Sequence, residues 1–191
     1  MIVLVLRSGG IYTADDAVRL ADQLGDSRVV VLSDVDVPLP RIPLAHGWPG
    51  WWAKMELFRP DLGLDDFLYL DLDTMVRGDL FHMEQCGRLA LLRDFYRQWG
   101  LGSGMMFLPA DVRNDIWLAW TANPSRWMAQ FQLGGDQEFL EQHWVHKAAR
   151  LQDLYPGEIA SYKASSPDEV RSAKVVCFHG EPKPRDINWT L

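Results

Sequence analysis

One segment of the chain joins a buried strand to a pair of acids. The apolar run Phe67-Leu68-Tyr69-Leu70 leads directly into Asp71-Leu72-Asp73. Side chains two residues apart on an extended chain point to the same face of a sheet. If the backbone stays extended here, the Asp71 and Asp73 carboxylates converge, and they repel one another unless a positive group lies between them. The segment therefore predicts a site for a hard divalent cation such as Mn²⁺ or Mg²⁺. The alternative is a turn with two surface acids, because aspartate is common in turns.

The size and charge of the chain limit its partners. It has 191 residues, of which 48% are hydrophobic and 24% charged, which is typical of a globular protein with one sizeable core. The net charge of -7 leaves no broad basic surface, so nucleic acid is not an expected partner. A small anionic ligand stays compatible if a metal ion and nearby lysines offset the acidity. We expect a single domain over residues 1–191.

Two features bear on cellular location. Cys86 and Cys177 lie far apart and do not resemble a disulfide framework, which favours a reducing cytoplasm. The apolar segment from Met1 to Leu6 is too short for a signal peptide or a membrane span. We therefore expect a cytoplasmic protein with no membrane span, and we interpret residues 2–6 as a buried strand.

Strand-like and helix-like segments alternate along the chain. Continuous apolar runs predict strands over residues 2–6, 28–32, 67–70, 89–92, 105–108 and 175–178. Helical spacing predicts helices over residues 15–24, 50–58 and 111–120, with others starting near 124 and 135. Residues 38–49 are rich in proline and predict a loop. This order indicates the α/β class, with a mixed, mostly parallel, Rossmann-like sheet flanked by helices.

Polar residues follow several of the predicted strands. In open α/β sheets, ligands bind beyond the carboxyl ends of the strands. The residues at such ends are Ser8, Asp34, Asp71, Asp73, Asp94 and His179. We therefore expect them to face a common binding site.

Three basic side chains are candidates for that site. His179 ends an apolar strand and precedes Gly180, and imidazole can complete the coordination of Mn²⁺ beside carboxylates, although an isolated histidine is more often structural. Lys183 lies in a rigid Pro-Lys-Pro segment and can meet a phosphate. Lys54, on an apolar helix, has the same interpretation. For both lysines the alternative is a solvated or snorkelling side chain.

The segment Gly134-Gly135-Asp136-Gln137 lies at a predicted helix start. Asp136 either caps that helix or, with Gln137, meets the reacting carbon of a ligand that the paired glycines admit. The sequence pattern leaves both interpretations open.

Five segments, taken in order, resemble glycosyltransferase family 8, the glycogenin-like and galactosyltransferase-like enzymes with a GT-A fold. Lys54-Met55-Glu56-Leu57-Phe58 is similar to the family's Lys-Leu-x-x-aromatic helix, and Asp71-Leu72-Asp73 to its Asp-x-Asp motif. Gly102-Ser103-Gly104-Met105-Met106-Phe107 resembles the Asn-Ser-Gly-Val strand, Gly134 to Gln137 matches Gly-Gly-Asp-Gln, and Phe178 to Pro184 resembles the His-x-x-Gly-x-x-Lys-Pro ending. The resemblance spans most of the chain.

The resemblance implies a metal-dependent glycosyltransferase. Its donor is a nucleotide-diphosphate sugar, usually a UDP-sugar, and its acceptor is a glycan, a protein or a small molecule. Mn²⁺, or Mg²⁺, bridges the diphosphate to Asp71, Asp73 and a histidine, for which we choose His179. The sugar is transferred with retention at the anomeric carbon, and the metal stabilises the departing diphosphate.

The resemblance also assigns the remaining site residues. Asp136 and Gln137 lie near the reacting sugar as the candidate catalytic residues. The expected donor-binding residues are Tyr12, which stacks on the base, Asp34, Lys54, Asp94, which binds sugar hydroxyls, Ser103, Gly180 and Lys183.

The chain departs from the family pattern in several places. Gly102 replaces an asparagine that contacts the sugar, which leaves the choice of donor open. Cys177, not His179, aligns with the family's metal-binding histidine; we choose His179 because manganese favours imidazole over thiolate. Arg185 replaces a common tryptophan, and the chain is short for the family.

Two alternatives belong to other functional classes. A sugar-phosphate nucleotidyltransferase uses the same metal and phosphate chemistry, and Arg7 with Ser8-Gly9-Gly10 faintly resembles its loop. A non-catalytic protein that binds nucleotide sugars or carbohydrates on the same scaffold is the second.

Overall fold

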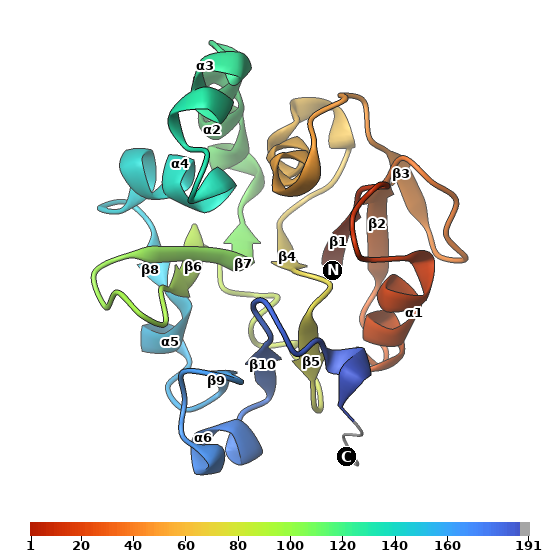
Figure 1. Cartoon of the computed structure of the whole chain (residues 1–191), viewed down its shortest axis with the longest axis vertical. Coiled ribbons are helices and arrows are strands. Elements are labelled where there is room, and N and C mark those ends of the chain that lie inside the picture. The colour runs from red at the N-terminus through yellow and green to blue at the C-terminus, as the bar shows by residue number, and fades with distance from the viewer. Residues whose placement is uncertain (188–191) are drawn as a thin grey trace.

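The computed structural model describes residues 1–187 and contains a seven-stranded sheet, whose arrangement can be followed in Figure 1. In spatial order its strands are β3 (Arg41–Pro43), β2 (Val29–Ser33), β1 (Ile2–Leu6), β4 (Phe67–Leu70), β7 (Leu101–Leu108), β6 (Ala90–Arg93) and β8 (Ala149–Arg150). Strand β1 pairs in parallel with β2 and β4, whereas β7 runs antiparallel to both β4 and β6. The expected mixed, mostly parallel α/β sheet is confirmed.

A smaller sheet extends the fold beyond β4. It consists of β5 (Thr74–Val76), β10 (Val175–Cys177) and β9 (Ile159–Ser161). Strand β10 pairs with β5 in antiparallel and with β9 in parallel orientation. Because β5 follows Asp73 directly and β10 precedes His179, this sheet brings the C-terminal segment to the acidic end of β4.

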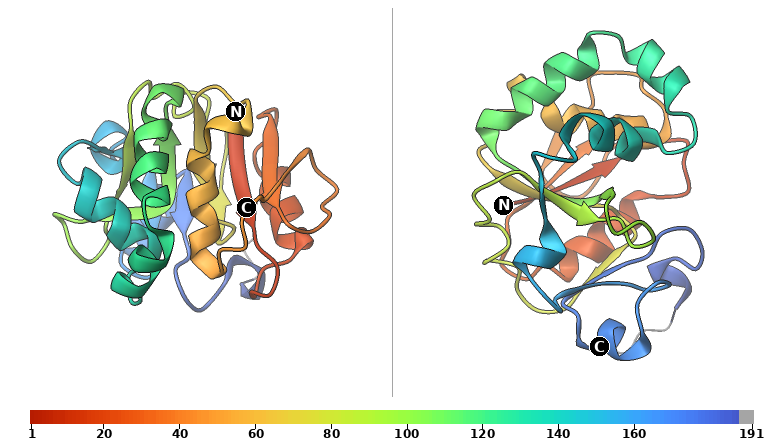
Figure 2. Two further views of the ribbon diagram at one scale, coloured as in Figure 1. Left: turned by 90° about the horizontal axis from the view of Figure 1, so that it is seen from above. Right: turned by 90° about the vertical axis from the view of Figure 1, so that its left-hand side faces the viewer.

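Helices cover both faces of the large sheet (Figure 2). The α-helices are α1 (Ala14–Asp22), α2 (Ala110–Thr121), α3 (Pro124–Gln130), α4 (Gly135–Trp144), α5 (Leu151–Leu154) and α6 (Pro167–Ser172). The 3₁₀ helices are η1 (Gly50–Phe58), η2 (Pro60–Leu62) and η3 (Pro184–Asp186). Figure 1 shows α2, α3 and α4 gathered at one end of the molecule and the small sheet with α6 at the other.

Strand β1 shows why its sequence is apolar throughout. Val3 and Val5 belong to the core cluster that contains η1, α2 and α4, whereas Ile2, Leu4 and Leu6 belong to the cluster on the opposite face, with α1. A strand that is covered on both faces needs apolar side chains at every position. The continuous run at the N-terminus is therefore a central strand, as the sequence predicts.

Two local expectations are wrong. The proline-rich segment 38–49 is not only a loop, because Arg41–Pro43 forms β3 at the sheet edge, where proline is tolerated. The extended backbone also does not continue through Asp71 and Asp73. Strand β4 ends at Leu70, and the chain turns, with the Thr74 amide donating to the Asp71 carbonyl oxygen at 3.1 Å.

Among residues 1–187, no helix combines the length and the apolar character that crossing a bilayer requires. Cys86 and Cys177 are both free thiols, as expected from their spacing.

Candidate active site

A cavity of about 740 Å³ opens beyond the carboxyl ends of β1 and β4. It brings together almost all of the residues that the sequence singles out. Those that line it are Tyr12, Lys54, Asp71, Asp73, Asp94, Ser103, Asp136, Gln137, His179, Gly180 and Lys183. Ser8 and Asp34 are the exceptions, since neither lines the cavity. Asp34 accepts a hydrogen bond from the Ser8 amide at 2.8 Å and pairs with Arg7 at 3.3 Å. The Asp34 carboxylate therefore stabilises the loop that follows β1.

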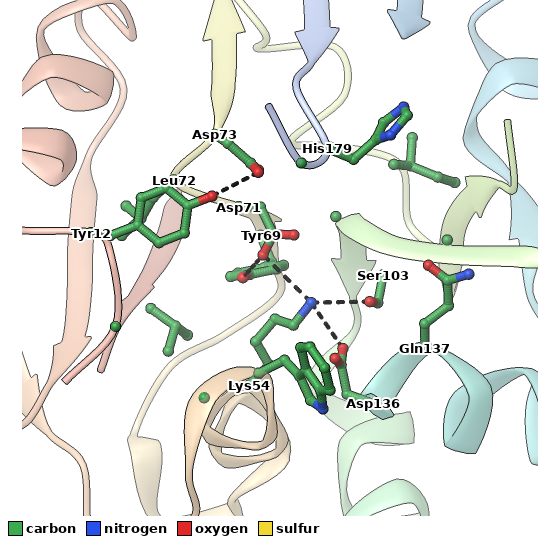
Figure 3. Close-up of a pocket in the computed structure, with 18 of the residues that line it drawn as sticks. Tyr12, Lys54, Tyr69, Asp71, Leu72, Asp73, Ser103, Asp136, Gln137 and His179 are labelled. Atoms are coloured by element: carbon green, nitrogen blue, oxygen red, sulfur yellow. Dashed lines mark hydrogen bonds and ion pairs between the residues drawn. The ribbon is translucent and has the colours of Figure 1, made fainter. Parts of the chain in front are cut away.

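One side of the cavity centres on a buried lysine. Lys54 Nζ lies 2.9 Å from Asp136 Oδ2 and 3.5 Å from Asp71 Oδ1, and it donates to Ser103 Oγ at 3.0 Å (Figure 3). Burial alone would lower the pKa of Lys54, but the Asp136 and Asp71 carboxylates more than offset this and raise it above its ordinary value. Burial also raises the pKa of Asp136. The Lys54 charge acts against this shift at Asp136, so each charged group of the pair stabilises the charge of the other.

A second charged group lies at the other side of the cavity. Tyr12 donates its phenolic hydrogen to Asp73 Oδ2 at 2.7 Å, and Lys183 Nζ donates to the same carboxylate oxygen at 3.0 Å and to the Tyr12 hydroxyl at 2.6 Å. Asp71, in turn, accepts from the Tyr69 hydroxyl. Each aspartate of the pair is thus held by one tyrosine and one lysine.

The two aspartates have the chemistry of a divalent-cation site. Burial raises the pKa of Asp73, and the neighbouring Asp71 charge raises it further. A cation between the two carboxylates would therefore lower the free energy of keeping both ionised. Among the described residues, no cluster of three His, Cys, Asp or Glu side chains could hold a metal ion. Two carboxylates nevertheless fit a cation such as Mg²⁺, which commonly keeps bound water and takes its other ligands from substrate phosphates.

His179 lies at the cavity but does not face the aspartates. Its Nε2 atom is 2.7 Å from Ser161 Oγ, and its ring packs against Phe95 and Tyr96. Figure 3 shows the imidazole pointing away from Asp73. Burial lowers the pKa of His179, so the neutral imidazole is favoured. Cys177 lies in the core, where burial raises the pKa of its thiol.

The Asp-Gln pair of α4 occupies the cavity wall opposite Tyr12. Gly134 is the N-cap of α4, so Asp136 is not the helix cap, and this structural alternative is wrong. Gln137 Nε2 donates to Asp94 Oδ2 at 3.1 Å. Gly102, the departure from the family pattern, lies beside them, and a Cβ there would be 3.1 Å from Leu92 Cβ. The close approach to Leu92 explains a glycine at this position.

Several residues that line the cavity were not predicted as site residues, and Tyr69 is one of them. Tyr69 lies two residues before Asp71, and it was assigned only to the buried strand, although its hydroxyl reaches that carboxylate. Trp51 is 51% exposed and lines the cavity against Gly135. The paired glycines at 134 and 135 indicate that another group approaches the backbone closely. Nothing in the sequence identifies Trp51 as that group.

Gly135→Ala is expected to destabilise the protein more than an ordinary glycine substitution. Gly135 has φ +60°, and a Cβ would lie 2.8 Å from Trp51 Cε2. The left-handed backbone costs about 1–2 kcal/mol for a residue with a side chain, and displacing the indole adds to this. The matched control is Gly157→Ala, with φ +79° and no atom within 4 Å of the added Cβ. Equal losses in urea unfolding would refute a packing role for Trp51 at this glycine.

Comparisons with known proteins identify solved structures with a similar fold. No family model and no curated protein sequence matches the chain. Among solved structures, the glycosyltransferase GlyE of Streptococcus pneumoniae TIGR4 is similar, with a TM-score of 0.65 and 16% identity over 100% of this chain. The chain spans 56% of the length of that structure.

The chain spans a larger share of two further solved structures. The galactosyltransferase LgtC, solved with donor and acceptor sugar analogues, has a TM-score of 0.65 and 15% identity, over 96% of this chain and 88% of LgtC. Mouse xyloside xylosyltransferase 1 has a TM-score of 0.57 and 11% identity, over 96% of this chain and 99% of that one. The expected fold is therefore confirmed: the chain has the GT-A fold that these glycosyltransferases share.

Proposed function

We propose that the protein is a metal-dependent glycosyltransferase that uses a nucleotide-diphosphate sugar, with a UDP-sugar as the first candidate. The observation that carries the proposal is the cavity itself. Lys54, Lys183 and the Asp71–Asp73 pair come from distant parts of the chain and converge there, next to Asp136 and Gln137. The fold is one that known glycosyltransferases use, which adds support.

The two sides of the cavity suit different parts of such a donor. Lys183, with the Tyr12 hydroxyl, offers hydrogen-bond donors and positive charge to a diphosphate. Asp71 and Asp73 would hold Mn²⁺ or Mg²⁺, and when bound this cation would stabilise charge on the departing diphosphate. Asp136, Gln137 and Asp94 supply carboxylate and amide groups suited to sugar hydroxyls.

The proposed reaction transfers the sugar with retention. The bond between the anomeric carbon and the diphosphate oxygen breaks, and its electron pair leaves with the diphosphate. The anomeric carbon forms a bond to an acceptor hydroxyl oxygen on the face from which the diphosphate departs, and the hydroxyl proton passes to the departing diphosphate. Asp136, held in place by Lys54 at 2.9 Å, supplies negative charge near the carbon that becomes positive.

A donor screen tests this function. We expect the protein with Mn²⁺ to release UDP from UDP-glucose or UDP-galactose, or GDP from a GDP-sugar, and EDTA to stop the release. Pyrophosphate formed from a sugar phosphate and a nucleoside triphosphate would instead identify a nucleotidyltransferase. Manganese-dependent UDP binding without release from any donor, even after long incubation with candidate acceptors, would identify a non-catalytic binding protein.

A further inference from the structure

The loop between β6 and β7, residues 94–100, contains a charge network at the edge of the cavity. Arg97 donates to Asp94 Oδ2 through Nε at 3.0 Å and through Nη2 at 2.7 Å. The same guanidinium reaches Glu141 of α4, with Nη1 and Nη2 each 2.9 Å from a carboxylate oxygen. A planar guanidinium can bind two carboxylates in fixed directions, which a lysine ammonium does less well. Arg97 therefore connects this loop to α4.

Glu141 anchors this network to the interior. Its Oε2 atom also accepts a hydrogen bond from the Leu101 amide at 2.9 Å, at the start of β7. Gly100 packs against it, since a Cβ there would lie 2.9 Å from Glu141 Oε2 and 3.1 Å from Asp94 Cβ. Glu141 follows Gln137 by four residues, so both side chains lie on the same face of α4, one turn apart. Gln137 therefore has one part of the network beside it on α4, at Glu141, and the other part beside it in the loop, at Asp94.

Asp94 forms hydrogen bonds with both Arg97 and Gln137 and so connects them. Its Oδ1 atom accepts from the Tyr96 and Arg97 amides at 2.8 and 3.0 Å, and its Oδ2 atom, already bound to Arg97, accepts from Gln137 Nε2 at 3.1 Å. An ionised carboxylate only accepts hydrogen bonds, so the amide must present its NH₂ group to Asp94. The Gln137 Oε1 atom then lies on the other side, 3.9 Å from the position of a Cβ on Gly102, which lines the cavity.

We propose that Arg97 is a positioning residue. It fixes Asp94, and through Asp94 it sets which end of the Gln137 amide faces the cavity, so that a bound sugar meets a hydrogen-bond acceptor there and not a donor. Arg97 itself is not among the residues that line the cavity. The proposal rests on the proposed function only in naming the sugar as the group that Gln137 meets.

A set of variants tests the role in turnover. With the nucleotide sugar that supports release of UDP or GDP, Arg97→Met is expected to lower kcat by about tenfold to a hundredfold, because the catalytic side chains lose their fixed geometry. The Kd for UDP with Mn²⁺ should change by less than about twofold, since the diphosphate side of the cavity is intact. Arg97→Lys should recover part of kcat. The matched control is Arg93→Met, whose guanidinium pairs with Asp153 and donates to Gln98 Oε1 of the loop at 3.2 Å but contacts neither Asp94 nor Glu141.

A second readout needs no ligand. In ¹H–¹⁵N spectra, the side-chain NH₂ signals of Gln137, assigned by their loss in Gln137→Glu, should lie away from those of solvated glutamines. Arg97→Met should move them toward solvated values, and Arg93→Met should leave them in place.

The outcomes separate the two proposals. If Arg97→Met matches Arg93→Met in kcat and in the Gln137 signals, the positioning role is refuted. If the wild type turns over no donor while the Gln137 signals depend on Arg97, the positioning role stands and the transferase function fails. A loss of kcat with unchanged Gln137 signals would also contradict the role proposed for Arg97.

Discussion

Lys54→Met is expected to lower the free energy of unfolding by about 3–5 kcal/mol, because it removes one partner of a buried ion pair. Lys54 is 9% exposed and Asp136 3% exposed, and their charged atoms lie 2.9 Å apart. Methionine fills a similar volume without supplying charge, so Asp136 must stay buried without its cation or take up a proton. Urea unfolding at neutral pH measures the loss, and turnover of the donor should fall with it.

The double variant Lys54→Met/Asp136→Asn separates stability from chemistry. Replacing the Asp136 carboxylate with an amide removes the buried charge, so most of the lost stability should return. Turnover should not return, because both members of the pair are missing. If the single variant is as stable as the wild type, the pair does not contribute the electrostatic stabilisation described above.

Asp73→Asn is expected to reduce turnover by about a hundredfold to a thousandfold while the protein stays folded, an effect comparable to removing one group that stabilises a transition state. The asparagine has almost the same shape, but it lacks the charge that binds Lys183 and that would bind a cation. The control is Asp36→Asn, on a fully exposed side chain. Full activity in Asp73→Asn with Mn²⁺ present would remove Asp73 from the mechanism.

The same variant should show a pH-dependent gain in stability relative to the wild type. Burial and the Asp71 charge raise the pKa of Asp73 above its ordinary value of 3.8. The folded state therefore holds the Asp73 proton more tightly than the unfolded state, and wild-type stability falls as the pH rises above that value. Asp73→Asn lacks this loss, so its stability relative to wild type should increase between about pH 4 and pH 7. Chemical denaturation at both values measures it, and no change would contradict the direction of the shift.

Apolar patterning predicted the large sheet because burial on both faces leaves a clear signal. The strands at Ile2–Leu6 and Phe67–Leu70 are found as expected, with their polar neighbours at the cavity. The three-residue strand at Arg41–Pro43 was missed because an edge strand needs neither burial nor alternation. The pattern also failed at Asp71, where a turn replaces the extended chain and still delivers both carboxylates to one cavity.

The partners of the site residues could not be predicted from the sequence. Lys54 was expected at a phosphate, yet it lies between Asp71, Asp136 and Ser103. Tyr12 was expected to stack on a base, and the contact of its hydroxyl with Asp73 was not predicted. These contacts join residues that are between 17 and 82 positions apart in the printed numbering. Such distances are set by tertiary packing, which local spacing does not encode.

The central claim is that the Asp71–Asp73 pair and Lys183 form the diphosphate site of a sugar-nucleotide cavity. Calorimetric titration of UDP, with and without Mn²⁺, into the wild type and into Asp73→Asn tests it most directly. We predict saturable one-to-one binding to the wild type that requires Mn²⁺ and that is lost in Asp73→Asn. Binding of equal strength without the cation, or equal binding by the variant, would contradict the claim.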